Sequence, residues 1–132
     1  MHFADRAQAG RALADRLAEY AGRDDVTVLG LPRGGLPVAA EVARALRAPL
    51  DVWCVRKLGV PGHEEMAMGA IASGGERVVD RGTLEMVGVS DAAVDRVVGD
   101  EAYELARRER LYRGARGTPV LRRRTAILVD DG

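Results

Sequence analysis

The sequence predicts an α/β fold in which a parallel sheet is flanked by helices. The apolar run at residues 126–129 is continuous rather than alternating, which is typical of a strand buried on both faces of a parallel sheet. Residues 26–31 predict another strand, because they are rich in apolar and β-branched residues. Residues 4–20 and 36–46 instead repeat their apolar side chains at helical spacing. The order strand, glycine-rich turn, helix over residues 26–46 fits the same fold.

Length and composition limit the domain count and the possible partners. At 132 residues, with 47% of them hydrophobic, the chain is long enough for a real core and is one domain at most. Its 20 acidic and 20 basic residues balance, so no net field attracts nucleic acid or an anionic membrane. No apolar run approaches the ~18 residues of a membrane span. Because the single cysteine, Cys54, lies in an apolar stretch, we expect a buried thiol and a cytoplasmic protein.

The middle of the chain predicts further elements with weaker signals. We expect a second strand at residues 50–56, followed by a glycine-, proline- and methionine-rich connection whose first half is mobile. Residues 68–72 and 77–80 indicate short strands, and the stretch that continues to residue 89 reads as irregular. Ser90 or Asp91 then caps a long helix that runs to about Arg113.

The first candidate site is the turn Pro-Arg-Gly-Gly at residues 32–35, between the first strand and its helix. Backbone N–H groups at a helix start bind phosphate well, and Arg33 adds a planar donor for the same anion. The alternative is that Gly34 and Gly35 only make a tight connection. The turn matches neither a Rossmann fingerprint nor a Walker loop.

Two more polar groups follow apolar runs. Arg56 and Lys57 follow the second expected strand, where they either face a ligand or are a solvated strand end. Asp130 and Asp131, with Gly132 after them, follow the terminal run and suit sugar hydroxyls or a hydrated cation, unless they are merely a polar turn.

These groups together favour one class of ligand. If they share one edge of a parallel sheet, they would bind a compound that carries phosphates, vicinal hydroxyls and Mg²⁺. The adjacent residues His63, Glu64 and Glu65 do not have the spacing of a zinc site, because neighbours in a loop do not converge on one ion.

The ordered set of motifs resembles the type I phosphoribosyltransferases, in the bacterial group of unassigned acceptor. The stretches that carry the resemblance are Leu-Pro-Arg-Gly-Gly at 31–35, Val-Arg-Lys-Leu-Gly at 55–59, Glu-Met-Ala-Met-Gly-Ala-Ile at 65–71 and Ile-Leu-Val-Asp-Asp-Gly at 127–132. They arrive in the family's order and span nearly the whole chain.

The resemblance implies a role for each motif. Arg33, Gly34 and Gly35 would hold the pyrophosphate of phosphoribosyl pyrophosphate, and Arg56 and Lys57 would reach the same group. Residues 57–89 would form the hood that closes over the substrates. Asp130 and Asp131 would be the catalytic acids that contact the ribose hydroxyls. The implied reaction is displacement of pyrophosphate by a nucleobase-like acceptor. Mg²⁺ would be held mainly by substrate and water, with no protein ligand assigned to it.

The sequence departs from the family after Asp-Asp-Gly. The family continues into a Thr-Gly turn that opens a helix and grips the 5′-phosphate, whereas these residues stop at Gly132. We therefore expect an incomplete parallel sheet, no turnover by the fragment, and a tendency to form homo-oligomers through the exposed half-sheet. The alternative function is a non-catalytic module that binds phosphoribosyl compounds or nucleotides. The acceptor base stays open.

Overall fold

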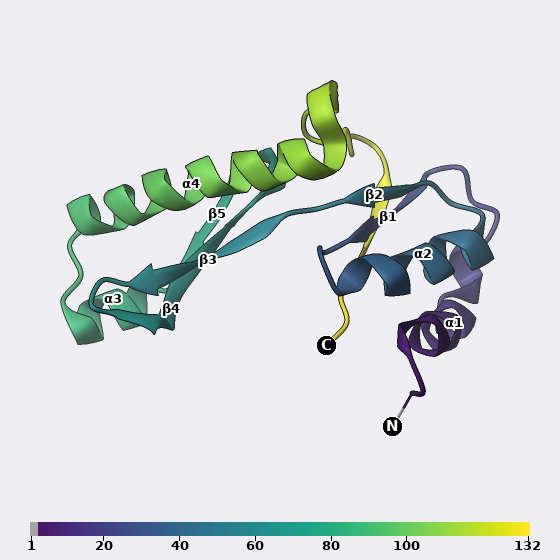
Figure 1. Ribbon diagram of the computed structural model, residues 1–132, viewed down its shortest axis with the longest axis horizontal. Coiled ribbons are helices and arrows are strands. Elements are labelled where there is room, and N and C mark those ends of the chain that lie inside the picture. The colour runs from purple at the N-terminus through teal and green to yellow at the C-terminus, as the bar shows by residue number, and fades with distance from the viewer. Residues whose placement is uncertain (1–2) are drawn as a thin grey trace. The chain divides into compact units, whose positions relative to one another are not determined.

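The computed structural model describes residues 3–132, and their contacts form two compact units. The first contains residues up to Trp53 together with residues 119–132, and the second contains residues 54–118. Each unit has its own three-stranded sheet, parallel in the first and antiparallel in the second (Figure 1). The expected hood, residues 57–89, falls entirely within the second unit.

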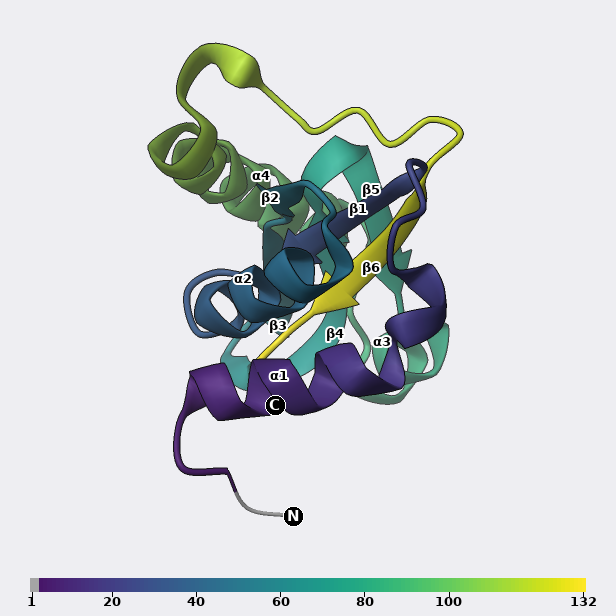
Figure 2. The same ribbon diagram turned by 90° about the vertical axis from the view of Figure 1, so that its right-hand side faces the viewer.

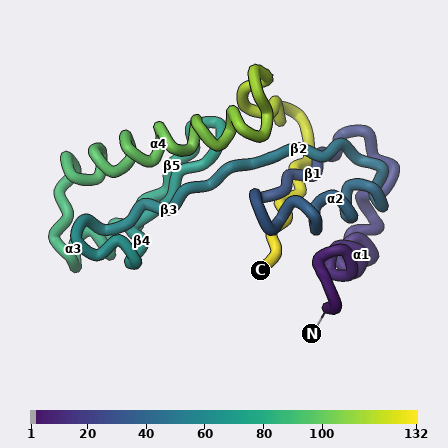
Figure 3. The backbone as a smooth tube through the Cα atoms, viewed as in Figure 1, coloured from purple at the N-terminus to yellow at the C-terminus, as the bar shows by residue number. Residues whose placement is uncertain are grey.

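The sheet of the first unit confirms the predicted parallel α/β arrangement. Its strands are β1 (Val26–Gly30), β2 (Leu50–Val52) and β6 (Thr125–Val129), in the order β2-β1-β6. The last strand along the chain runs beside the first one, as the backbone trace shows (Figure 3). The helices are α1 (Arg6–Arg16), a short 3₁₀ turn (Ala18–Tyr20) and α2 (Gly35–Leu46), close to the predicted ranges.

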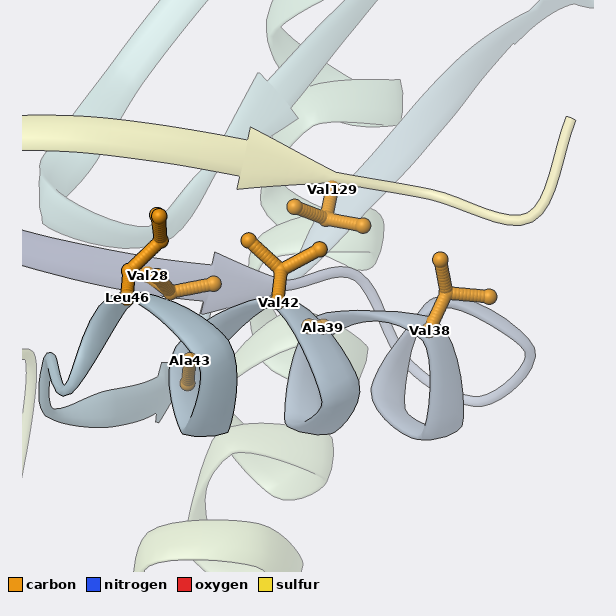
Figure 4. Packing of buried hydrophobic residues seen from close by; sticks show 7 residues of the cluster. All are labelled: Val28, Val38, Ala39, Val42, Ala43, Leu46 and Val129. Atoms are coloured by element: carbon orange, nitrogen blue, oxygen red, sulfur yellow. The ribbon is translucent and has the colours of Figure 1, made fainter. Parts of the chain in front are cut away.

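The core of this unit lies between α2 and the sheet (Figure 4). Helix α2 repeats its apolar residues on one face, and that face meets Val28 of β1 and Val129 of β6. The members contributed by the helix are Val38, Ala39, Val42, Ala43 and Leu46. Helix α1 packs closely on α2 at Gly10, where a Cβ would lie 2.7 Å from the Val38 carbonyl oxygen.

One strand differs from the prediction in its burial. The apolar run of β6 was expected to be buried on both faces, but its residues alternate and Leu128 is 57% exposed. Among the described residues β6 pairs only with β1, and β1 is the central strand with all five residues buried. An edge strand needs one apolar face only, so the continuous run did not identify the central strand.

The second unit corrects two predictions. The strand expected at residues 50–56 is divided between β2 and β3 (Val55–Val60), which belong to different sheets. The connection that follows is a hairpin of β3 with β4 (His63–Ala72), which contains the strand expected at residues 68–72, and Gly62 at its turn has φ +81°. The region expected to be irregular contains helix α3 (Arg81–Val87), capped by Asp80 and ended by Gly88 in the left-handed conformation. The short strand β5 (Glu76–Val79) is confirmed.

Helix α4 (Asp91–Arg113) confirms the long helix and its Ser90 cap. It lies along the antiparallel sheet (Figure 1). Side-chain pairs connect the two: Arg56 to Glu101 at 2.7 Å and Arg77 to Asp95 at 3.2 Å. None of the helices within residues 3–132 is long and apolar enough to cross a membrane.

A polar network, buried at Cys54 and Ser73 and exposed at Thr118, joins the two ends of the second unit. The Ser73 hydroxyl accepts the Cys54 N–H (3.0 Å) and donates to Glu109 (2.9 Å), while the Ser73 N–H donates to the Cys54 carbonyl (2.9 Å). The Thr118 hydroxyl donates to the other Glu109 oxygen at 2.8 Å. Cys54 and Thr118 are the first and last residues of the unit. The Cys54 thiol is buried as predicted, and burial raises its pKa.

We expect Leu46→Ala to lower the free energy of unfolding by about 2–5 kcal/mol, because Leu46 is 1% exposed and its removal leaves a cavity under the sheet. Urea denaturation followed by circular dichroism measures the change. Leu111→Ala is the control, since this helical leucine is 69% exposed and should change stability by about 0.5 kcal/mol or less. Equal effects of the two substitutions would contradict the packing described here.

Candidate functional site

The ends of β1 and β6 bring two of the predicted motifs to the same edge of the parallel sheet. Gly30 and Val129 are paired in register, and the Leu31 N–H donates to the Val129 carbonyl at 3.0 Å. The turn at residues 32–35 and the acids at residues 130 and 131 therefore leave the sheet side by side (Figure 2). This edge is the carboxyl end of the strands, where open α/β sheets bind ligands.

The turn before α2 is closed by its own backbone. The Gly35 N–H donates to the Leu31 carbonyl (2.9 Å), the Leu36 N–H donates to the Arg33 carbonyl (3.2 Å), and the peptide bond between Pro32 and Arg33 is cis. The Arg33 side chain is exposed at this turn. Its guanidinium can therefore meet an anion beside the start of the helix.

Gly34 and Gly35 allow the acids to approach the turn. A Cβ on Gly34 would lie 1.9 Å from Oδ2 of Asp131, and one on Gly35 would lie 2.7 Å from the Val129 carbonyl oxygen. Gly34 has ordinary helical dihedrals, so space and not backbone conformation requires a glycine there. Gly34 and Gly35 of the turn predicted to hold pyrophosphate thus lie directly against the residues predicted to hold ribose.

The Asp131 carboxylate has a partner that the sequence analysis missed. Nη2 of Arg6, in the first turn of α1, donates to Oδ2 of Asp131 at 3.0 Å. This hydrogen bond holds the pKa of Asp131 below its usual range. The Asp131 N–H in turn donates to Oδ1 of Asp130 at 2.8 Å. Arg6 is a basic residue in the first turn of a helix, where a positive charge is unfavourable because of the helix dipole. This unfavourable position was the one signal in the sequence that Arg6 has an acidic partner elsewhere.

An apolar groove of about 480 Å³ adjoins the acids within the first unit. Its walls include Ala9 and Leu13 of α1 and Val38 of α2, and Asp130, Asp131 and Gly132 lie at its margin. The acids therefore border both the polar turn and an apolar surface.

Arg56 and Lys57 lie in the second unit, inside β3 and not at the end of a parallel strand. This position corrects the prediction, which placed them after a strand of the parallel sheet. Arg56 donates to Glu101 of α4 at 2.7 Å, and each of these side chains is about a quarter exposed. The exposed Lys57 lines the same groove as Arg56, which also includes Asp100 and Glu101 of α4. The two cations therefore border one groove within the second unit.

Metal-binding donors are sparse in the part of the chain that the structure describes. Residues 3–132 contain no group of three or more His, Cys, Asp or Glu side chains placed to hold an ion. His63 and Glu65 are 3.9 Å apart and both are well exposed.

Comparison with known proteins decides the family. A family model described as a phosphoribosyl transferase domain matches residues 3–132. The chain belongs to this family. Two proteins named "Putative phosphoribosyl transferase", from two strains of Mycobacterium tuberculosis, are each 50% identical to it over 130 residues, which is 98% of this chain. The chain spans 29% of the length of those relatives.

A solved structure supports the same assignment. The crystal structure of a Thermus thermophilus protein superposes with a TM-score of 0.73 at 42% identity, and the match covers 100% of this chain and 62% of that one. The resemblance found in the sequence motifs is confirmed, and so is the α/β fold class.

We expect Gly35→Ala to destabilise the protein by about 1–3 kcal/mol, because the new methyl group would press on the backbone of β6. Gly34→Ala should leave the fold intact and displace the Asp131 side chain instead, since that carboxylate can rotate away. Thermal unfolding measures the first effect, and the Asp131 resonances in an NMR spectrum report the second.

Gly99→Ala is the control for both, because a Cβ at Gly99 of α4 meets no atom within 4 Å. It should stabilise the helix by up to about 1 kcal/mol. A Gly35→Ala variant as stable as the wild type would contradict the close approach of β6 to α2.

Proposed function

We propose that this site transfers the 5-phosphoribosyl group from phosphoribosyl pyrophosphate to a nucleobase-like acceptor, with release of pyrophosphate. The observation that carries the proposal is the contact between the turn at residues 33–35 and the carboxylates of Asp130 and Asp131 at one sheet edge. A phosphorylated sugar needs an anion site and hydroxyl acceptors at this short separation. Family membership supports the same reaction class.

The residues of the site act by positioning and charge. Arg33 would hold the pyrophosphate, and Asp130 and Asp131 would accept hydrogen bonds from the ribose hydroxyls. The acceptor nitrogen attacks the anomeric carbon as the bond to the pyrophosphate oxygen breaks, and that oxygen keeps the electron pair. The sugar becomes positive in the transition state, so nearby carboxylates favour it and cations favour the leaving group.

The available donors suit a magnesium ion carried mainly by the substrate. Carboxylate oxygens such as those of Asp130 and Asp131 are the hard donors that Mg²⁺ prefers, but they fall short of a complete ligand set in the described residues. Bound Mg²⁺ would supply positive charge to the leaving pyrophosphate. The chain's own part is to orient that complex at the turn.

Arg56 and Lys57 remain predicted pyrophosphate contacts. For Arg56 this role has a cost, because its guanidinium already bonds to Glu101 at 2.7 Å. A phosphate group would have to replace that carboxylate. Lys57 is exposed and forms no ion pair with another residue of the described range 3–132.

We further propose that residues 1–132 alone bind the substrate without turning it over. The chain spans 29% of the length of the relatives that it matches, so further groups that hold the substrate would belong to the longer protein. Binding with no transfer to any base is also the outcome expected of a regulatory module, so transfer by a longer chain separates the two functions.

We expect Arg33→Ala to weaken the binding of both phosphoribosyl pyrophosphate and pyrophosphate by about tenfold or more, because hydrogen bonds to charged groups contribute about 1.5–3 kcal/mol. Asp131→Asn should weaken phosphoribosyl pyrophosphate only, since pyrophosphate has no ribose hydroxyls. Isothermal titration calorimetry in the presence of Mg²⁺ measures both affinities. Arg122→Ala, at an exposed arginine of the same unit, is the charge control. If Arg33→Ala and Arg122→Ala bind equally well, the proposed site is wrong.

We also expect Glu101→Gln to tighten pyrophosphate binding several-fold, because it removes the carboxylate that competes for Arg56. Asp95→Asn is the matched control. Asp95 lies on the same helix as Glu101, and its substitution breaks the ion pair with Arg77 of the sheet. The same calorimetric titration applies. Unchanged or weaker binding in Glu101→Gln would exclude Arg56 from the pyrophosphate contacts.

A further inference from the structure

We propose that Arg6 is a positioning residue of this site, which fixes the Asp131 carboxylate and screens its charge from the pyrophosphate. The inference rests on the proposed function and adds the N-terminal helix to the substrate site. Oδ2 of Asp131 lies between the Arg6 guanidinium and the backbone of Gly34. Arg6 donates to this oxygen at 3.0 Å, and a Cβ on Gly34 would lie 1.9 Å from it.

The contact with Gly34 creates an electrostatic conflict. The turn at residues 33–35 is the proposed anion site, yet a carboxylate lies directly against it. Two negative groups at this separation repel each other, which lowers affinity for the ligand. A guanidinium bonded to the carboxylate balances its negative charge, and this removes most of the repulsion between the carboxylate and the bound anion. Arg6 is the residue that stands there.

Arg6 is held in place by a well-anchored helix. Asp5 caps α1 by accepting the Gln8 N–H at 2.8 Å, and α1 packs on α2 at Gly10. Helix α2 begins at the same turn that approaches Asp131. The backbone position of Arg6 is therefore fixed by the elements that form the site.

A structural role alone does not account for this arrangement. The Arg6 and Asp131 side chains are 58% and 34% exposed, and ion pairs of this kind contribute little to stability. Arg6 also lies at the positive end of the helix dipole, where a cation is unfavourable. The main effect of the ion pair between Arg6 and Asp131 is to offset the negative charge of Asp131 beside the turn at residues 33–35.

A double-mutant cycle tests this role. Pyrophosphate with Mg²⁺ is titrated calorimetrically into wild type, Arg6→Ala, Asp131→Asn and the double variant at low salt. We expect Arg6→Ala to weaken pyrophosphate binding about three- to tenfold, as for one partly exposed charge. In the Asp131→Asn background the same substitution should have a smaller effect, because the carboxylate that repels the anion and holds the guanidinium beside the turn is gone. Arg6→Lys should restore most of the affinity.

Arg11→Ala is the matched control, since it removes an exposed arginine of the same helix and changes the net charge equally. If Arg6→Ala behaves like Arg11→Ala, or loses equal affinity in the Asp131→Asn background, the proposed role of Arg6 is wrong and the proposed function stands. If wild type binds neither pyrophosphate nor phosphoribosyl pyrophosphate, both proposals fail.

The pKa of Asp131 gives a second readout that needs no ligand. In the wild type its carboxyl should titrate below the usual range of an aspartate, and Arg6→Ala should raise its pKa towards that range. Carboxyl carbon shifts in a pH titration by NMR measure this. An Asp131 pKa that is the same in both proteins would show that the contact is absent in solution and would overturn the inference.

Discussion

The close approach of the end of β6 to the start of α2 is the constraint on which the first unit depends. The Val129 carbonyl and the Asp130 backbone occupy the space in which a Cβ of residue 35 would stand. Glycine at residues 34 and 35 therefore lets a strand end and a helix start share one edge of the sheet. The acids, the arginine turn and the partner from α1 all take their positions from that contact.

The sequence predicted the first unit well because its signals are local. Helix α2 shows its apolar face in every turn, and β1 is a short run rich in β-branched residues, with all five of its residues buried. The second unit was harder, because its strands are defined by their pairing. The first half of β4 is exposed and belongs to a strand only through its partner β3. Helix α3 has seven residues, too few to show a period, although Asp80 and Gly88 marked its ends.

The site was predictable where one geometric rule applied. Parallel strands place their carboxyl ends at one edge, and this rule brought Asp130 and Asp131 to the turn at residue 33. It could not find Arg6, which lies 125 residues from its partner along the chain. It also misplaced Arg56, because the strand assumed to carry it is two strands of different sheets. Contacts made by tertiary packing leave no pattern in neighbouring residues.

The network around Ser73 has a consequence for how such a chain can vary. It links Cys54 to Thr118 through Glu109, so the two ends of the second unit are held together by that unit's own side chains. A segment whose ends are close can be inserted into, or exchanged within, a host fold without disturbing the host's strand order. Residues 54–118 have the architecture of such an insertion between β2 and β6. The sequence of residues 54–118 can then change in evolution while the parallel sheet and its ligand-binding edge stay the same.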